Sequence, residues 1–425
     1  MARKMKDSGI EWIGEIPEGW EVKYFVQLFS QVKNKNIGLR EKNLLSLSYG
    51  KIKQKSIETV GGLLPDNFEG YNIIDSNDIV LRLTDLQNDQ HSLRVGLSHE
   101  RGIITSAYCS IRVRGAESPN YLYYYLHTFD IAKGFYGMGS GVRQGLNWDG
   151  LKYIKILLPP QHEQDRISVF LNQKTLEIDS MLSKTISSIE EYKKLKQAVI
   201  TQAVTKGVRG ERAMKDSGVE WTGEIPAEWK IQRFAHVAEV KSNLVSPDNY
   251  LEYPQISPEN IEKDSGKLLL PCRTVAEVGV ISGNHLFYKG QILYSKIRPK
   301  LNKVCIAPFD GLCSADMYPI ETKNDTRYIM YCILSNGFLQ QVSMITENRV
   351  KMPKINQVEL SKILVAIPET IAEQKEIADY LDVKCAEIDG LIAKKEQLVK
   401  ELESYKKSLI YEVVTGKREV KNYER

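Results

Sequence analysis

One block of residues occurs twice in this chain, and this repetition constrains the fold more than any other feature. Residues 5–20 read MKDSGIEWIGEIPEGW and residues 214–229 read MKDSGVEWTGEIPAEW. The two blocks are 209 residues apart, and 12 of their 16 aligned positions are identical. Because such self-similarity is typical of repeated structural units, the chain is predicted to contain two copies of one plan.

A second repeated segment follows each block at nearly the same distance. Residues 163–205 align without a gap to residues 373–415, at an offset of 210, and a proline shortly precedes each segment. Between these anchors the copies barely resemble each other, and only isolated matches such as Asn147 and Asn356 remain. The predicted order is therefore block, variable domain and helix, followed by the same three parts again.

The two repeated segments have the spacing of long amphipathic helices. Taken at alternating steps of four and three residues, seven of ten positions are apolar in the first segment and eight of ten in the second. This spacing is typical of a coiled-coil seam. Each helix would be about 60 Å long, at about 1.5 Å per residue. The predicted seam residues are Ile167, Leu171, Ile178, Met181, Tyr192, Val199, Ile377, Leu381, Ile388, Leu391, Leu398, Leu402 and Leu409.

Either each helix lies alone on a globular core or the two helices pair with each other. Their shared period and length favour an antiparallel pair with a domain at each end. We therefore expect an α+β chain with pseudo-two-fold symmetry, in which two mixed α/β domains are separated by two long helices that form an antiparallel coiled coil. The predicted boundaries are residues 1–157 for the first domain, 158–210 for the first helix, 211–366 for the second domain, and 367–425 for the second helix and tail.

Composition narrows the class of protein only coarsely. The 425 residues are 42% hydrophobic and 26% charged, as in ordinary globular proteins. The net charge of +4 is compatible with nucleic-acid binding but too small to argue for it. No run approaches 18 apolar residues, which argues against a transmembrane helix, and the polar start is unlike a signal peptide. Six scattered cysteines predict reduced thiols and a cytoplasmic location.

Basic and polar residues gather in predicted loops of the variable domains, residues 21–157 and 230–366. Arg, Lys, Asn and Gln hydrogen-bond to base edges, and Lys and Arg neutralise phosphates. For any single residue the alternative is a surface charge that contacts only water. The tryptophans of the repeated block are interpreted as structural rather than as stacking residues. The candidate DNA-contacting residues are Lys33, Asn34, Lys35, Arg40, Lys51, Lys53, Arg82, Arg143, Lys241, Asn243, Lys296, Arg298, Arg349 and Lys351.

Motifs of the enzymes most often tied to DNA recognition are missing from the sequence. Residues 135–141, FYGMGSG, resemble an S-adenosylmethionine loop, but a predicted helix precedes them and no N-P-P-F-type motif follows. We interpret them as a glycine-rich loop. No G-x-x-x-x-G-K-[ST] sequence occurs, and the six histidines lack metal-ligand spacing. No catalytic and no metal-binding residue is therefore predicted.

This layout resembles that of the specificity subunit of a Type I restriction–modification system, over the whole length of the chain. The resemblance rests on a set of paired motifs rather than on any single one. These are the S-G-[IV]-E-W-x-G-E-I-P-x-x-W blocks at 8–20 and 217–229, E-Q-x-x-I at 163–167 and 373–377, I-D at 178–179 and 388–389, and V-T at 204–205 and 414–415.

The resemblance implies a recognition subunit that is not itself an enzyme and has no cofactor of its own. Its two target-recognition domains would each read one half of a bipartite, asymmetric site in double-stranded DNA, and its coiled coil would set the spacing. The implied partners are two methyltransferase subunits and restriction–translocation subunits. They would supply adenine-N6 methylation with S-adenosylmethionine, and cleavage with ATP and magnesium.

Two other hypotheses remain open at this point. The chain could be a protein-binding adaptor without a role on DNA, in which the variable domains bind protein. It could also be a self-contained DNA-modifying enzyme, although the repeats account for nearly every residue and leave little room for a catalytic core.

Overall fold

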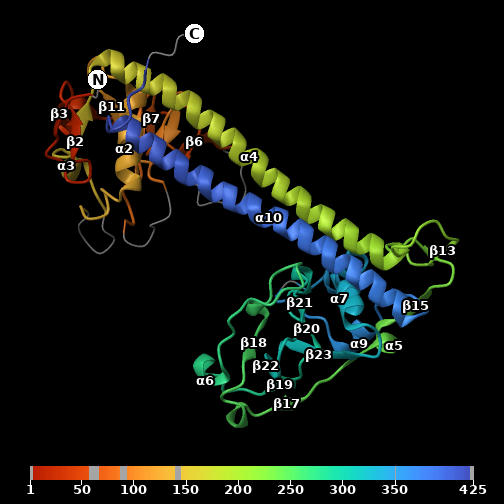
Figure 1. Cartoon of the computed structure of the whole chain (residues 1–425). Coiled ribbons are helices and arrows are strands. Elements are labelled where there is room, and N and C mark those ends of the chain that lie inside the picture. The colour runs from red at the N-terminus through yellow and green to blue at the C-terminus, as the bar shows by residue number, and fades with distance from the viewer. Residues whose placement is uncertain (1–2, 57–66, 87–92, 139–144, 350, 422–425) are drawn as a thin grey trace. The chain divides into compact units, whose positions relative to one another are not determined.

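The computed structural model describes residues 3–56, 67–86, 93–138, 145–349 and 351–421 (Figure 1). It divides into two compact units: unit 1 comprises Met1–Thr185 and Leu398–Arg425, and unit 2 comprises Ile186–Gln397. Each unit therefore contains one mixed α/β domain and parts of the two long helices, α4 (Gln161–Lys206) and α10 (Ile371–Val414). This architecture confirms the predicted fold class, whereas the predicted domain boundaries stay a prediction.

The domain of unit 1 is built on a four-stranded antiparallel sheet in the order β4-β11-β8-β9. Its strands are β4 (Phe29–Gln31), β11 (Cys109–Val113), β8 (Ile79–Leu81) and β9 (Val95–Leu97). Two-stranded pairs surround it: β1 (Met5–Asp7) with β2 (Glu15–Pro17), β3 (Glu21–Tyr24) with β12 (Lys155–Leu158), β5 (Leu45–Ser48) with β6 (Lys51–Gln54), and β7 (Asn72–Ile74) with β10 (Gly102–Ile104). Its helices are α1 (Phe25–Leu28), α2 (Pro119–Ile131) and α3 (Trp148–Leu151).

The domain of unit 2 repeats this plan with the sheet order β16-β23-β20-β21. These strands are β16 (Ala238–Val240), β23 (Met317–Thr322), β20 (Ile292–Ser295) and β21 (Val304–Ile306). A second sheet has the order β17-β19-β22-β18, with β17 (Leu244–Val245), β19 (Asn284–Phe287), β22 (Gly311–Cys313) and β18 (Gln255–Ile256). The remaining elements are β13 (Met214–Asp216), β14 (Glu224–Pro226), β15 (Lys230–Arg233), β24 (Leu364–Ile367), α5 (Phe234–Val237), α6 (Val275–Val278), α7 (Thr326–Leu334), α8 (Asn336–Thr346) and α9 (Gln357–Ser361), with short 3₁₀ turns at 247–249, 258–260 and 299–301.

The repeated block fastens the start of each long helix to its domain. Trp20 is buried, and its Nε1 donates a hydrogen bond to Glu163 of α4 at 3.0 Å. In unit 2, Trp229 Nε1 donates to Glu373 of α10 at 3.2 Å. An arginine of the same unit, Arg3 or Arg212, forms an ion pair with each of these carboxylates. We therefore interpret Trp20 and Trp229 as structural, because each indole is buried and donates to a glutamate that is half-buried in unit 1 and buried in unit 2.

Each domain also holds the far end of the long helix that begins in the other unit. The buried Tyr121 hydroxyl lies 3.1 Å from the carbonyl oxygens of Leu157 in β12 and Val414 at the end of α10. In unit 2, the Tyr328 hydroxyl lies 2.7 Å from the carbonyl oxygen of Ala366 and 3.4 Å from that of Val204 in α4. The helices therefore pair antiparallel within each unit, since the beginning of one lies beside the end of the other.

The buried positions of the helices recur at every eleventh residue. Along α4, Ile167, Ile178, Ile189 and Ile200 are all less than 9% exposed. The equivalent residues of α10 are Ile377, Ile388, Val399 and Ile410, of which Val399 is half-buried and the others buried. Three turns per repeat correspond to about 3.67 residues per turn, close to the value of about 3.6 for a straight helix.

The heptad period that we assumed in the sequence therefore assigned part of the seam wrongly. A heptad has about 3.5 residues per turn and drifts around a straight helix by about 20° each time. Met181, Leu391 and Leu398 are 53%, 41% and 43% exposed, so they lie outside the buried seam. Tyr192, Val199 and Leu402 are half-buried. The other predicted seam residues are buried: Ile167, Leu171, Ile178, Ile377, Leu381, Ile388 and Leu409.

Candidate nucleic-acid interface

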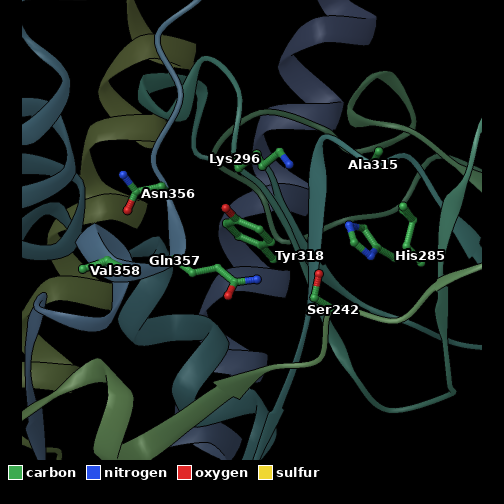
Figure 2. Close-up of a pocket in the computed structure, with 9 residues that line it drawn as sticks. Ser242, His285, Lys296, Ala315, Tyr318, Asn356, Gln357 and Val358 are labelled. Atoms are coloured by element: carbon green, nitrogen blue, oxygen red, sulfur yellow. The ribbon is translucent and has the colours of Figure 1, made fainter.

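A cleft of about 550 Å³ lies on the domain of unit 2, where the loops after several strands meet (Figure 2). Polar and aromatic side chains from several elements or their adjoining loops surround it. Its lining residues are Ser242, Leu244, His285, Lys296, Ala315, Tyr318, Asn356, Gln357 and Val358. Amide, hydroxyl, imidazole and ammonium groups thus converge on one concave surface, and such groups can bond to base edges and phosphates.

Backbone hydrogen bonds bring the distant parts of the cleft together. The Arg298 amide donates to the Pro353 carbonyl at 2.8 Å, and the Ile355 amide donates to the Lys296 carbonyl at 2.9 Å. These bonds place the start of α9 beside the end of β20. Asn356 then caps α9, since its Oδ1 accepts a hydrogen bond from the Glu359 amide at 2.9 Å.

Lys296 and His285 give the cleft its electrostatic character. The Lys296 ammonium lies 5.2 Å from the centroid of the Tyr318 ring, within the range of a cation–π contact. His285 is 5% exposed, and its burial, together with the charge of Lys296, lowers the pKa of its imidazole. The imidazole is therefore neutral at neutral pH.

The Nδ1 atom of His285 has no hydrogen-bond partner among the residues that the structure describes. A buried polar atom without a partner costs about 1–3 kcal/mol. His285 lines the cleft beside Ala315, whose backbone hydrogen-bonds with the imidazole. The His285 side chain is thus a candidate for contact with a ligand of the cleft, and a shift of the ring that gives Nδ1 a partner would recover that free energy.

The loop of unit 2 that carries Ser242 has a close equivalent in unit 1. The Lys241 amide donates to the Pro319 carbonyl at 2.8 Å, as the Val32 amide does to the Ser110 carbonyl. Two residues later, the carbonyl oxygens of Asn243 and Asn34 accept from the amides of Leu286 and Ile73, at 2.8 and 2.6 Å. The two candidate asparagines therefore occupy the same place in the two domains.

Equivalent positions around this loop carry different side chains in the two units. Lys33 replaces Ser242, and Asn72 replaces His285, since Asn72 pairs with Lys35 as His285 pairs with Leu244. Asn72 is 6% exposed, and its Oδ1 likewise has no partner in the described part of the chain. Both units thus keep a buried polar atom without a partner at this position, on side chains of different chemistry.

The contrast continues at the first turn of α9, which borders the cleft. Asn147 caps α3 in unit 1 just as Asn356 caps α9 in unit 2. The next residue is Trp148 in unit 1 and Gln357 in unit 2. The backbone frame is therefore shared, while the side chains that it presents differ.

The structure brings together several of the candidate DNA-contacting residues. Lys33, Asn34, Lys35 and Arg40 lie exposed in one loop, where the Arg40 guanidinium donates to the Lys35 carbonyl at 3.4 Å. In unit 2, Lys296 and Arg298 lie beside the segment that includes Lys351.

Other candidate residues lie elsewhere or are engaged in ion pairs. Lys51 contacts Asp179 at 2.9 Å, Lys241 contacts Glu239 at 2.7 Å, and Arg349 pairs with Glu359. Lys53 is exposed on β6, and Arg82 is half-buried just after β8. Arg143 lies outside the described residues, as do positions 139–141 of the glycine-rich segment.

The residues that sequence reasoning missed are His285, Asn72, Tyr318 and Gln357. Two signals in the sequence could have indicated them. A polar histidine interrupts the otherwise strand-like run NHLF at 284–287, and the match between Asn147 and Asn356 marks the turn that presents Gln357.

Two findings concern classes of site rather than single residues. Within the described ranges, no group of three or more His, Cys, Asp or Glu is arranged to hold a metal ion. Among the helices described, none is both long and apolar enough to cross a bilayer.

Comparisons with known proteins agree with this architecture. The family model of the type I restriction modification DNA specificity domain matches residues 226–401. The specificity subunit of the type I restriction enzyme EcoDI of Escherichia coli is 38% identical over 253 residues, which cover 56% of each chain. The match thus spans little more than half the length of that relative. The MjaVIII specificity subunit of Methanocaldococcus jannaschii is 23% identical, covering 96% of this chain and 95% of its own.

Solved structures extend the likeness of fold to nearly the whole chain. A chain from a structure of the assembly and conformational transition of the type I R-M system superposes with a TM-score of 0.68 at 14% identity, covering 95% of this chain and 99% of its own. The HsdS subunit from Thermoanaerobacter tengcongensis gives a TM-score of 0.50 at 14% identity, covering 95% of this chain and 98% of its own. With its two repeated units and its paired long helices, the chain is similar to the specificity subunits of type I restriction–modification systems, and its residues 226–401 match their DNA specificity domain.

Proposed function

We propose that the chain reads a bipartite, asymmetric site in double-stranded DNA, with one domain on each half. One observation carries this proposal. The two domains share a backbone frame down to individual hydrogen bonds, yet present different side chains at the equivalent positions 33 and 242, and 72 and 285. Two domains with the same backbone structure and different contacting side chains suit two half-sites of different sequence. Two identical domains would suit a palindromic site.

In this proposal the chain supplies the sequence address, and its partners supply the chemistry. Two methyltransferase subunits would carry adenine-N6 methylation with S-adenosylmethionine, and restriction–translocation subunits would use ATP and magnesium. The chain itself would catalyse no reaction and bind no cofactor. The base that is methylated would be flipped from the duplex, at a cost of a few kcal/mol, and two anchored domains can help to offset that cost.

The long helices offer apolar surface to such partners. Val169 and Leu176 of α4 are 68% and 69% exposed, and Val383 of α10 is 57% exposed. Leu391, Leu398 and Tyr405 are also exposed and recur at every seventh position, along one stripe of α10. Exposed apolar rows of this kind are typical of helices that dock a partner helix. We assign them to the methyltransferase subunits.

The test is to co-express the chain with the methyltransferase subunit of its own system and to sequence the host DNA for N6-methyladenine. We expect two defined half-sites around an unspecified gap. Replacing residues 21–157 by the matching domain of another specificity subunit should change one half of this motif and leave the other unchanged. Methylation without the chain, or a continuous motif that the exchange leaves unaltered, would contradict the proposal and favour the adaptor hypothesis.

A further inference from the structure

The two Ile-Asp motifs of the long helices take part in reciprocal ion pairs. In unit 1, Asp179 of α4 accepts a hydrogen bond from Lys406 of α10 at 2.5 Å. In unit 2, Asp389 of α10 accepts two from Lys196 of α4, each at 2.9 Å. The two aspartates are related by the offset of the repeat, 210, and so are the two lysines, so each repeat donates its lysine to the aspartate of the other.

The domain of each unit adds a second lysine to its aspartate. Lys51, at the start of β6, lies 2.9 Å from Asp179, and Lys267 lies 2.7 Å from Asp389. Burial alone would raise the pKa of both aspartates, but the hydrogen bonds from the two lysines lower it below its ordinary value. Lys196 is itself 6% exposed. A buried ammonium that loses its partner is strongly destabilising, so this contact tolerates little displacement.

The most regular apolar row of the helices does not select one register by itself. Isoleucine or valine recurs at every eleventh position along both helices. Sliding one helix along the other by one such repeat would therefore again place these side chains opposite one another. Repetitive apolar seams commonly need a polar or charged contact to choose between such alternatives.

Together with the contacts of Tyr121 and Tyr328 to the helix ends, the ion pairs provide that choice. Asp179 precedes Lys196 on α4 by the same number of positions as Asp389 precedes Lys406 on α10, so one register satisfies both pairs. After a slip by one apolar repeat in either direction, Asp179 would face Lys395 or Lys417, while Asp389 would face Thr185 or Gly207. One aspartate would then lose its interhelical partner.

We propose that the reciprocal pairs Asp179–Lys406 and Asp389–Lys196 are positioning contacts that fix the register of the antiparallel helices. They thereby set the number of base pairs between the two half-sites. This role in spacing rests on the proposed function, whereas the role in fixing the register does not.

The register is tested on the full chain by zero-length carbodiimide cross-linking and mass spectrometry. We expect amide links between Asp179 and Lys406 and between Asp389 and Lys196. The ion pair of Lys354 with Asp316, at 2.9 Å within unit 2, controls for reactivity. Links from Asp179 to Lys395 or Lys417, or a linked control without either reciprocal link, would overturn the proposal.

The role in spacing is tested by neutralising both pairs together, with Asp179→Asn, Lys406→Met, Asp389→Asn and Lys196→Met, so that no charge is left buried alone. We expect the N6-methyladenine motif to show more than one gap length, with helical circular dichroism retained. The matched control, Lys51→Gln with Lys267→Gln, should keep a single gap. A folded quadruple variant with the single wild-type gap would refute this role. If that variant does not fold, Asp389→Asn with Lys196→Met should show more than one gap length, because Asp179 can still pair with Lys395 or Lys417 after a slip, and a single gap would refute the role. Failure of the proposed function would instead appear as no chain-dependent motif in the wild type.

Discussion

Units 1 and 2 differ least where backbone atoms form the contacts and most at the side chains that line the cleft of unit 2 and at their equivalents in unit 1. The bonds of Val32 and Asn34 in unit 1 recur at Lys241 and Asn243 in unit 2, because amides and carbonyls are present whatever the side chain. At the neighbouring positions the residues change freely, from lysine to serine or from asparagine to histidine. The backbone frame is therefore the same in both units although the side chains at these positions differ.

The largest expected effect is a loss of stability when the buried tryptophan that both units share is replaced. Replacing Trp229 by Ala opens a cavity and removes the cover from the buried pair of Arg212 with Glu373. We expect a loss of about 3–5 kcal/mol in the free energy of unfolding. Trp20→Ala should cost a similar amount, because its indole likewise donates to a glutamate that pairs with an arginine. Urea unfolding of both variants measures this, and a loss confined to one unit would show that the two frames are not equivalent.

A smaller effect concerns the pH dependence of stability, to which unit 1 contributes a buried histidine that unit 2 lacks at the equivalent position. Burial, and then the charges of Lys406 and Lys407, lower the pKa of His127 to about 4. At the equivalent position of α7, six residues after Tyr328, stands Leu334. Because the unfolded chain binds this proton more readily, stability should fall as the pH drops from about 6.5 to about 4 and then level off, by roughly 3 kcal/mol in all.

The variant His127→Leu makes unit 1 resemble unit 2 at this position and should remove that part of the pH dependence. Unfolding free energies measured at intervals between pH 7 and pH 4 provide the test. The sign follows from the lowered pKa, which disfavours the protonated imidazole in the folded state. If wild type and variant fall in parallel, His127 is not the group that titrates.

Exchanging the buried polar residues at the equivalent positions 285 and 72 should alter recognition more than stability. His285→Asn gives unit 2 the residue that unit 1 carries at position 72. We expect a change of about 1–3 kcal/mol in discrimination at one position of one half-site, which corresponds to roughly 5- to 150-fold. Methylation motifs measured in cells provide the readout, and Asn72→His is the matched variant for the other half. If a variant instead weakens binding to all DNA sequences equally, these residues support the structure of the domain and do not read bases.

The smallest expected effect concerns exposed cations. Lys33→Gln should weaken binding to all sequences about equally and reduce the slope of log affinity against log salt by about 0.9, the value for one phosphate contact. Lys6→Gln, on the exposed strand β1, is the matched control. Binding of the assembled complex to its site at several salt concentrations measures the slope. An unchanged slope would remove Lys33 from the phosphate contacts.

Sequence reasoning predicted the fold well because the repeated segments make the same contacts twice. The offsets of 209 and 210 locate both frames, and the long helices carry clear apolar periodicity. The predicted positions of the seam residues were partly wrong. Over about six helical turns, three heptads span about 21 residues and two eleven-residue repeats span about 22, so the heptad positions come to lie one residue too early. The structure shows this shift directly: Leu182, Ile189 and Ile200 are each more buried than the heptad position just before them.

The candidate site was harder to predict, because it depends on which loops meet in space. Lys296 and Asn243 were indicated by residue type, and the structure places Lys296 and the neighbour of Asn243 on the cleft. Lys51 was also chosen by type, but it contacts Asp179 instead. A surface lysine has the same appearance in a sequence whether it faces DNA or a carboxylate. His285 was missed because its role rests on contacts between strands far apart in the chain.

The way the chain closes on itself bears on its synthesis. Unit 2 is one continuous stretch, Ile186–Gln397, whereas unit 1 needs both the segment Met1–Thr185 and the segment from Leu398 onward. Val414 contacts Tyr121, and Tyr411 donates a hydrogen bond to the carbonyl of Trp12. On a ribosome, the first domain to emerge must therefore wait for the last helix, while the second can complete its core earlier. The segment made first would be the last to become fully folded.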